Sequence, residues 1–216
     1  MTEQRYSFQL ALSPSEVKAY FNLRQTIFCH EQRLFIDSDE DDIDQYAYPI
    51  VAIDHASPLN GGDPTPVAYG GKTPLASSRG TRPTQWLPSF SAGSRTRLAH
   101  EATPLNYVVG VVRIYESQTR LWYGGRLGVQ QDYRHVGRIG KGLIYKAVTT
   151  ANTWGCEQFL ATVQLQNVRF FKRLHWKSLS EITLCGLPHH LMEADLNYYP
   201  PGKETRPVLQ LQARAS

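Results

Sequence analysis

The sequence predicts an α/β fold in which a mixed, mostly antiparallel sheet carries a small number of helices. Short β-branched runs alternate with two long segments of helical periodicity, which favours this class over an all-helical or all-β fold. The chain has 216 residues, which suits one domain. Its 41% hydrophobic and 11% aromatic residues are enough for a packed core and exclude a globally disordered chain.

The chain is expected to begin with a strand and a capped helix. Residues 7–12 indicate the strand. Ser13 and Glu16 have the spacing of a capping box, and Pro14 suits the first helical position. Apolar side chains at helical spacing then extend the predicted helix through Cys29.

An acidic loop follows over residues 37–44. Its spacing lacks the pattern of a calcium-binding EF-hand. We therefore expect a solvated loop that attracts a cationic acceptor. A short strand over residues 49–53 comes next.

Residues 55–106 differ in composition from the rest of the chain. They contain 7 of the 13 prolines and 6 of the 16 glycines, and they show no sustained periodicity. We predict an inserted, mobile excursion between two strands, not a second domain. The net charge of this segment is +3, which accounts for most of the chain's net charge of +4. Because the excess charge lies mainly there, a nucleic-acid partner is not favoured for the folded domain.

Regular elements return after the insertion. A strand over residues 107–116 and another over 121–129 are expected to form a hairpin with a loop over 117–120. A helix over residues 139–154 ends at Gly155. The remaining expected elements are a strand over residues 159–164, a short helix over 168–174, and strands over 179–184 and 189–195. Residues 1–200 would then form one domain, and residues 201–216 a loose tail.

Targeting patterns and cysteine spacing suggest the compartment. No apolar run approaches the roughly 20 residues of a membrane span, and the first twelve residues lack the apolar core of a signal peptide. Cys29, Cys156 and Cys185 show no CxxC spacing, so they indicate neither a disulfide framework nor a zinc site. These features predict a reduced, cytoplasmic protein with buried thiols and no membrane partner.

The start of the second long helix carries the most informative pattern. Arg134, Gly137 and Gly140 lie in the turn and first helical residues, and Arg138 and Lys141 add positive charge there. Glycines let a ligand approach the backbone, and free amides at a helix start bind phosphate. The P-loop pattern and the dinucleotide-binding glycine pattern are both absent. The segment predicts a cradle for a pyrophosphate-bearing cofactor, with a glycine-bearing turn between solvated arginines as the alternative.

The same segment resembles the acetyl-CoA-binding segment of the GNAT superfamily of N-acetyltransferases. The resemblance lies in Leu127-Gly128-Val129 and in Tyr133-Arg134-x-x-Gly137-x-x-Gly140. It implies a GNAT-like α/β fold with a central cofactor-binding helix, acetyl-CoA as acyl donor and no metal. In such proteins the strand hydrogen-bonds the pantetheine arm and the loop amides hold the pyrophosphate. The implied cofactor-binding residues are Leu127, Gly128, Val129, Arg134, His135, Val136, Gly137, Arg138, Ile139, Gly140 and Lys141.

This loop departs from the family pattern by one residue. Two residues separate Gly137 from Gly140, where the family has one. The loop is therefore expected to bulge.

The resemblance continues downstream, from Gln164 to Trp176. This segment is similar to the family segment ending in Phe-Tyr-Glu-Lys-Leu-Gly-Phe, which packs a short helix against the cofactor. It adds Asn167 and Phe171 to the implied cofactor-binding residues. Phe171 takes the place of the tyrosine that often protonates the leaving thiolate. Because phenylalanine has no proton to give, another group does so, or the thiolate leaves unaided, or the protein transfers no acetyl group.

Two further resemblances concern the acceptor side and the subfamily. Leu23-Arg24-x-x-Ile27-Phe28-x-x-Glu31-Gln32 resembles a subset of the superfamily and the acyl-homoserine-lactone synthases, which share the fold. The expected substrate-binding residues are Arg24, Arg113 and Gln164. The phrases VVGVVRIYE, LWYGGRLGV and PHHLMEADL resemble a bacterial GNAT-like family encoded beside nitrile- or amide-metabolism genes.

Two carboxylates are candidates for the catalytic base. Glu31 and Glu116 are the expected general bases, acting directly or through water, with a solvated surface carboxylate as the alternative for each. His189, His190 and Glu193 form an HHxxE pattern. In a strand the two histidines point to opposite faces, so no metal site is predicted.

These observations favour an acyl-CoA-dependent N-acyltransferase that transfers acetyl from acetyl-CoA to a small-molecule amine. The alternative is a CoA- or nucleotide-binding module without transfer activity, acting as a pathway subunit, and Phe171 favours it. A third hypothesis is nucleic-acid binding through the insertion. The sequence leaves a homodimer open, and it does not name the acceptor, because acceptor grooves are built from variable loops.

Overall fold

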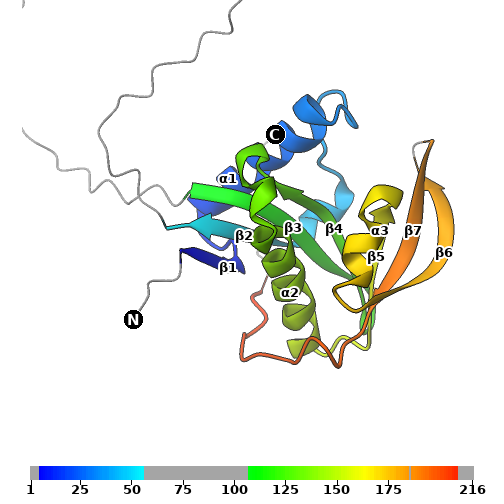
Figure 1. Cartoon of the computed structure of the whole chain (residues 1–216). Helices are drawn as coiled ribbons and strands as arrows, with labels where there is room; N and C mark the ends of the chain where they lie inside the picture. The colour runs from blue at the N-terminus through cyan, green and yellow to red at the C-terminus, as the bar shows by residue number, and fades with distance from the viewer. Residues whose placement is uncertain (1–4, 56–106, 185, 209–216) are drawn as a thin grey trace, which may run out of the picture. The chain divides into compact units, whose positions relative to one another are not determined.

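The computed structural model describes residues 5–55, 107–184 and 186–208. The predicted insertion, from residue 56 onward, and Cys185 lie outside these residues. Within them, seven strands form one sheet in the order β1-β2-β3-β4-β5-β7-β6 (Figure 1). The strands are β1 (Tyr6–Leu10), β2 (Tyr48–Asp54), β3 (Tyr107–Gln118), β4 (Leu121–Val129), β5 (Gln158–Gln164), β6 (Trp176–Leu184) and β7 (Leu187–Ala194). All neighbouring pairs are antiparallel except β4 and β5, which confirms the predicted fold class.

Three α-helices accompany the described sheet. They are α1 (Pro14–Gln25), α2 (Arg138–Thr153) and α3 (Val168–Lys172). The predicted capping box is present, since the backbone N–H of Glu16 donates to Ser13 Oγ and the Glu16 carboxylate accepts from the Ser13 N–H. α1 ends earlier than predicted because the chain widens into a π-helix over Thr26–Glu31. π-helical turns of this kind are frequent at functional sites.

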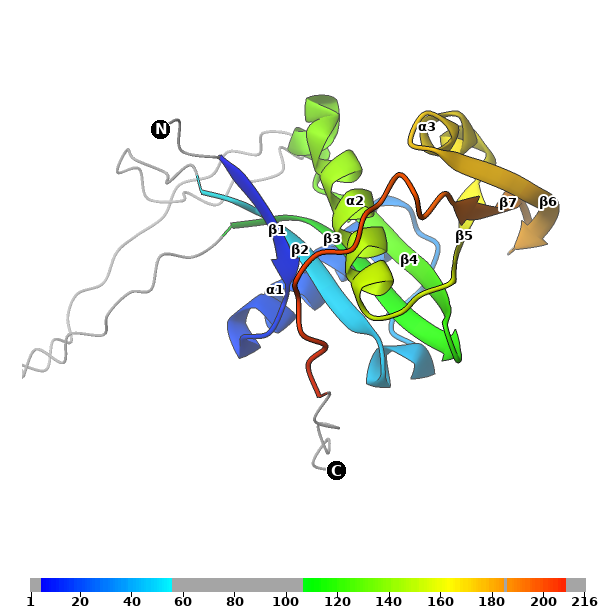
Figure 2. The same ribbon diagram turned by 90° about the horizontal axis from the view of Figure 1, so that it is seen from below.

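The two long helices cover opposite faces of the sheet (Figure 2). α1 packs on β2 and β3, and α2 packs on β1 to β4. The larger apolar core lies on the α2 face, where Leu143, Ala147 and Val148 are buried against the sheet. α2 approaches β1 closely because residue 142 is glycine, since a Cβ there would lie 2.1 Å from the Phe8 ring. No helix of the described part is long and apolar enough to cross a membrane.

The hairpin turn and the last strands differ slightly from the prediction. β4 has its predicted bounds, but β3 extends to Gln118, so only Thr119 and Arg120 connect the two strands, with Arg120 at φ 65°. β6 begins at the buried Trp176, before the predicted start at residue 179.

The predicted loose tail is wrong for residues 202–208. Thr150 Oγ1 donates to the Glu204 carboxylate at 3.0 Å, and Trp154 Nε1 donates to the Glu204 carbonyl at 2.9 Å. Arg206 donates to Tyr48 at 2.9 Å and forms an ion pair with Glu116 at 2.7 Å. The tail therefore crosses α2 and the sheet as part of the domain. Residues 209–216 lie outside the described residues.

Candidate functional site

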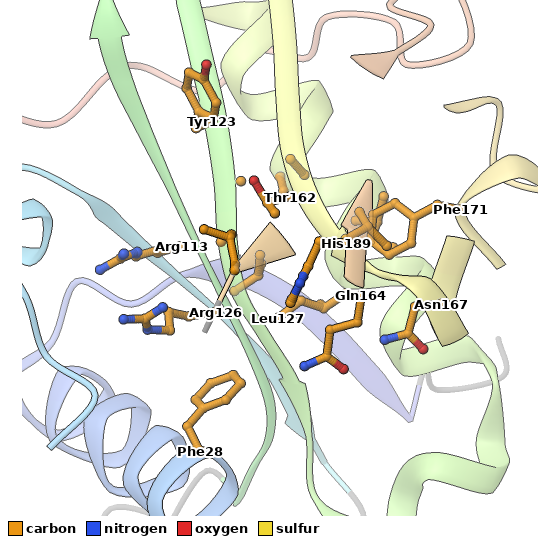
Figure 3. A pocket seen from close by; sticks show the side chains of 18 of the residues that line it. Phe28, Arg113, Tyr123, Arg126, Leu127, Thr162, Gln164, Asn167, Phe171 and His189 are labelled. Carbon is orange, nitrogen blue, oxygen red and sulfur yellow. The ribbon is translucent and has the colours of Figure 1, made fainter. Parts of the chain in front are cut away.

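The parallel pair β4–β5 separates part-way along its length. The strands pair from Leu121 and Gln158 as far as Gly124 and Ala161. Beyond these residues β4 remains paired with β3 and β5 with β7. A cavity of about 380 Å³ occupies the region where the two strands diverge, and residues from both faces of the sheet line it (Figure 3).

A β-bulge shapes the β4 wall of this cavity. The register between β3 and β4 shifts so that Arg126 and Leu127 together oppose Val112. Arg126 has φ 54°, a left-handed conformation that is costly for a residue with a side chain. Bulges re-aim side chains and interrupt strand pairing beside functional sites. The bulge therefore alters the β4 backbone where it borders the cavity.

The polar side chains of the cavity lie on the α1 side, where the apolar Phe28 and Phe35 also line it. Tyr123, Thr162, Gln164 and His189 line it, together with Arg113. Arg113 is 4% exposed, and its Nε has no hydrogen-bond partner within the described residues. The space beside this atom is open because residue 125 is glycine.

The two adjacent histidines of β7 point apart, as predicted. His189 lies opposite Gln164 in the register and points into the cavity (Figure 3). Its Nδ1 is 2.9 Å from the Leu187 carbonyl, which can only accept, so Nδ1 carries the proton and Nε2 keeps a free lone pair. His190 bonds Ser178 Oγ at 2.6 Å and lies 3.8 Å from Glu181. His189 is the histidine available to a ligand.

The opposite end of the cavity, on the α2 side, is apolar. α2 supplies Ile144, Ala147 and Val148, and other elements supply Phe159, Ala161, Val163, Phe171 and Trp176. Trp176 is the only one of these with a polar side-chain atom, and its Nε1 donates to Tyr199 at 3.1 Å, within the core. The polar groups of the cavity are thus confined to the α1 side.

The predicted cradle lies at the start of α2. Gly137 is the N-cap residue with φ 53°, and a Cβ placed there would meet nothing within 4 Å. Arg138 and Lys141 are exposed, and neither forms an ion pair within the described residues. The predicted bulge is absorbed by a 3₁₀-helix over Gln131–Val136 and by Gly137, so Gly140 lies within the first turn of a regular helix. Ile139 is buried in the core, and His135 is exposed.

Arg134 joins the cradle to the end of β4. Its Nε donates to the Val129 carbonyl at 2.9 Å, and its Nη2 pairs with the Glu31 carboxylate. Glu31 therefore lies beside the cradle, at the end of the π-helix. That helix packs closely on β4, since a Cβ on Gly128 would lie 2.8 Å from Ile27 Cδ1.

The acidic loop is only partly the solvated segment that the sequence predicts, because Asp37 and Asp42 are exposed but other aspartates are not. Asp39 is 2% exposed and Asp44 only slightly more accessible, because both pair with Arg24, which is fully buried. Arg113 pairs with Asp41 at 2.6 Å and with Asp44 at 3.0 Å. We call these residues, with Arg126, the ion cluster.

Arg126 completes the ion cluster from the bulge. Its guanidinium pairs with Asp39 at 3.1 Å and with Asp41 at 3.2 Å, and it lies over the Phe35 ring. Burial would raise the pKa of Asp44, but the hydrogen bond and charge of Arg24 outweigh it and the pKa is lowered. For Asp41 the hydrogen bond from Arg113 has the same effect. Asp41 and Asp44 therefore stay ionised beside the buried arginines.

The structure brings together some of the predicted site residues and separates others. Leu127, Arg113, Gln164, Asn167 and Phe171 line the cavity. Gly128 and Val129 continue β4 from the cavity toward the cradle. Arg24 lies in the ion cluster, without access to the cavity. Glu116 lies outside the cavity wall, where it pairs with Arg206 and accepts from the Arg120 N–H. Tyr123, Arg126 and Thr162 also line the cavity and were not predicted as site residues. The Gly124-Gly125 pair before Arg126 is a sequence signal of irregular strand geometry.

The comparisons with known proteins agree with this architecture. The profile of the Acetyltransferase (GNAT) family matches residues 74–176. The fold is that of the GNAT acetyltransferases. No curated protein matches the chain by sequence. Proteins of the GNAT family are generally acyl-CoA-dependent N-acetyltransferases.

Solved structures show the same fold over nearly their whole length. Escherichia coli ElaA has a TM-score of 0.56 at 17% identity, over 88% of this chain and 99% of that one. An acetyltransferase of the GNAT family from Staphylococcus aureus has a TM-score of 0.53 at 13% identity, over 88% and 99%. An acyl-CoA N-acyltransferase from Pseudomonas aeruginosa has a TM-score of 0.52 at 13% identity, over 88% and 98%. At these identities the likeness concerns the fold.

Coenzyme A fits the residues that this structure provides. Its pyrophosphate needs free amides and positive charge, and the start of α2 offers both beside an unobstructed Gly137. Its pantetheine arm needs a narrow slot with unpaired strand edges, which the separation of β4 from β5 supplies. Leu127, Gln164 and Asn167 border that slot.

Proposed function

We propose that the protein is an acyl-CoA-dependent N-acyltransferase that acts on the amine of a small molecule. The observation that carries the proposal is the opening of the sheet after Gly124 and Ala161, where a cavity is lined by polar side chains on its α1 side. The acyl-CoA supplies an activated acyl group, and acetyl-CoA is the donor expected from the sequence. We also propose that the protein belongs to the bacterial GNAT-like family encoded beside nitrile- or amide-metabolism genes.

The cofactor-binding roles follow the geometry of α2. The amides at Gly137, Arg138 and Gly140 hold the pyrophosphate, and the side chains of Arg138 and Lys141 add charge. Arg134 keeps this cradle against β4 through Val129 and Glu31. Glu31 is therefore proposed as a positioning residue rather than as the base.

His189 is the proposed general base for the acceptor amine. Its Nε2 lone pair is exposed to the cavity beside Gln164, whereas the Glu116 carboxylate lies elsewhere and is held by Arg206. In the reaction the amine nitrogen bonds the acyl carbon and the carbon–sulfur bond breaks. The proton lost by the amine passes through His189, and the thiolate takes up one proton. Arg113 and Gln164 are proposed to orient the acceptor.

Replacing His189 tests this assignment. His189→Gln should lower kcat by about 100-fold with little change in KM, because general-base catalysis contributes on that order. His190→Gln is the matched control, since that ring faces Ser178, and it should keep the wild-type kcat. An unchanged kcat in His189→Gln would exclude His189 as the base.

A second function, a CoA-binding module without transfer activity, is favoured by one observation. Phe171 lines the cavity, packs edge-on against Trp176, and brings no hydroxyl. Thermal shift with acetyl-CoA, followed by a thiol-release assay over a panel of amines, separates the two functions. Stabilisation with thiol release supports the enzyme, and stabilisation without release from any amine supports the module. No stabilisation by any CoA ester would overturn both.

A further inference from the structure

One N–H group of the buried Arg113 side chain lacks an acceptor. The Nη1 and Nη2 atoms of its guanidinium pair with Asp41 and Asp44 in the ion cluster. Its Nε has no hydrogen-bond partner within the described residues. A buried donor without a partner costs free energy, which an oxygen atom of a ligand would recover. Because native proteins rarely leave such a donor unsatisfied, this nitrogen indicates a ligand.

Gly125 leaves open space beside this N–H group. It lies opposite Arg113 in the register of β3 and β4, so a side chain at residue 125 would cover the arginine. Apart from the adjoining residues, a Cβ there would have two described atoms within 4 Å, Arg113 Nε at 3.6 Å and Arg113 Cγ at 3.9 Å. Both residues line the cavity. The missing side chain therefore gives an occupant of the cavity access to Nε.

The charged side chains in the cavity wall favour an anion. Arg113, Arg126 and His189 line the cavity, whereas no Asp or Glu is among its described lining residues. Burial and the nearby charge of Arg113 lower the pKa of Arg126, and a bound anion would oppose both effects. The wall thus differs from the acidic loop, which in sequence suggests a cationic acceptor.

The proposed base and the unsatisfied N–H group flank the opening of the sheet. Arg113 lies on β3, and His189 lies on β7, beyond the separation of β4 from β5 (Figure 3). A molecule that places an amine at His189 and an anionic group at Arg113 would span this opening.

We propose that the acceptor is an amine that also carries a carboxylate, and that the carboxylate accepts a hydrogen bond from Arg113 Nε beside Gly125. The inference rests on the proposed function and names the class of its acceptor. A hydrogen bond between two charged groups is roughly twice as strong as one between neutral groups. Arg113 and Gly125 therefore distinguish amino acids from amines that lack the carboxylate.

Matched acceptors test the role of the carboxylate with the full-length protein. Thiol release from acetyl-CoA is measured for α- and ω-amino acids, for their carboxamides, and for the amines that lack the carboxylate. For the best amino acid, kcat/KM should exceed the values for its carboxamide and its amine by at least about tenfold, the factor for a charged hydrogen bond. Equal or faster turnover of the carboxamide or the amine would overturn the inference. Release from none of these compounds would count against the proposed function, and the inference would fall with it.

Gly125→Ala locates the carboxylate. The added methyl group lies at van der Waals distance from Arg113 Nε, so it should cover the N–H group and leave the ion cluster intact. The KM for the amino acid should rise by at least about tenfold, and the affinity for CoA should not change.

Gly202→Ala is the matched control for this substitution. A Cβ at Gly202 would also have its nearest contact at 3.6 Å, but this residue lies outside the cavity wall, so the variant should keep the wild-type KM. A wild-type KM in Gly125→Ala would overturn the inference. If Gly125→Ala does not fold, the comparison of amino acids with their carboxamides decides.

Discussion

The acidic loop and the start of α2 are the two regions of concentrated charge in the described chain, and they use that charge in opposite ways. Asp39, Asp41 and Asp44 form ion pairs with buried arginines of the ion cluster. Arg138 and Lys141 face solvent without an ion-pair partner in the described part. In sequence both regions suggest a charged ligand. In the structure three of the loop's aspartates are paired in the ion cluster, whereas the two cations at the start of α2 face solvent.

The difference follows from burial. A charge removed from water is tolerated only when it is paired and hydrogen-bonded, so Arg24 requires the acidic loop to fold over it. An exposed cation at a helix start has no such requirement. Asp residues in the loop therefore stabilise the wall of the site, whereas cations at α2 remain available. Four substitutions or conditions test this contrast.

Removing one partner of the ion cluster should have the largest effect. Asp44→Asn leaves Arg24 and Arg113 short of a carboxylate and should lower the free energy of unfolding by about 3 kcal/mol. Chemical denaturation measures the change. Asp37→Asn, in the same loop but exposed, should change it by less than about 0.5 kcal/mol. Equal effects would show that burial does not distinguish the two acids.

Acid should unfold the protein through the same carboxylates. Because the folded pKa values of Asp41 and Asp44 are lowered, their stabilisation is complete above the unfolded pKa of about 4 and is lost as pH falls through the folded values. Melting temperatures between pH 5 and pH 3 should fall more steeply for the wild type than for Asp44→Asn. Parallel curves would contradict a role for the cluster in acid unfolding.

Blocking the cradle should impair binding more than stability. Gly137→Val places a branched side chain at the open N-cap and should weaken CoA binding by at least about tenfold. Gly155→Val is the matched control, because Gly155 also has positive φ, also has open space around it, and lies just past the other end of α2. Both variants should lose about 1 to 2 kcal/mol of stability from strain. Equal CoA affinities in the two variants would reject the cradle.

Removing a single exposed cation should have the smallest effect. Lys141→Ala should weaken CoA binding about threefold at low salt and less at high salt, since exposed charges are screened. Arg120→Ala, at the opposite end of β4, should leave the affinity unchanged. A salt-independent loss in Lys141→Ala would indicate a packing role for the side chain.

The sequence predicts what depends on neighbours along the chain. Ser13 with Glu16 locates the start of α1, and the glycines before and within the first turn of α2 locate the cradle. The ion cluster depends on residues that the fold brings together, such as Asp39 and Arg126, which are 87 residues apart. No local pattern distinguishes Asp39 from a solvated aspartate. The separation of β4 from β5 is equally non-local, because the loss of one strand pair leaves no periodicity in either strand.

The choice of the catalytic base also depends on contacts that local sequence does not predict. Glu31 and Glu116 are reasonable bases in sequence, but ion pairs with Arg134 and Arg206 hold them beside the cradle and outside the cavity wall. His189 becomes a better candidate only when its tautomer and its place opposite Gln164 are known. Strand alternation predicted that one of the two histidines faces away from the other, and the register decides which one faces the cavity.

We expect a CoA thioester to bind from the start of α2 into the opening between β4 and β5. A crystal structure of the protein with CoA would show whether it does. The pyrophosphate should lie against the backbone amides of Gly137, Arg138 and Gly140, and the pantetheine arm between Leu127 and Gln164. A CoA molecule bound elsewhere, with these amides and the cavity free of it, would rule out this binding mode.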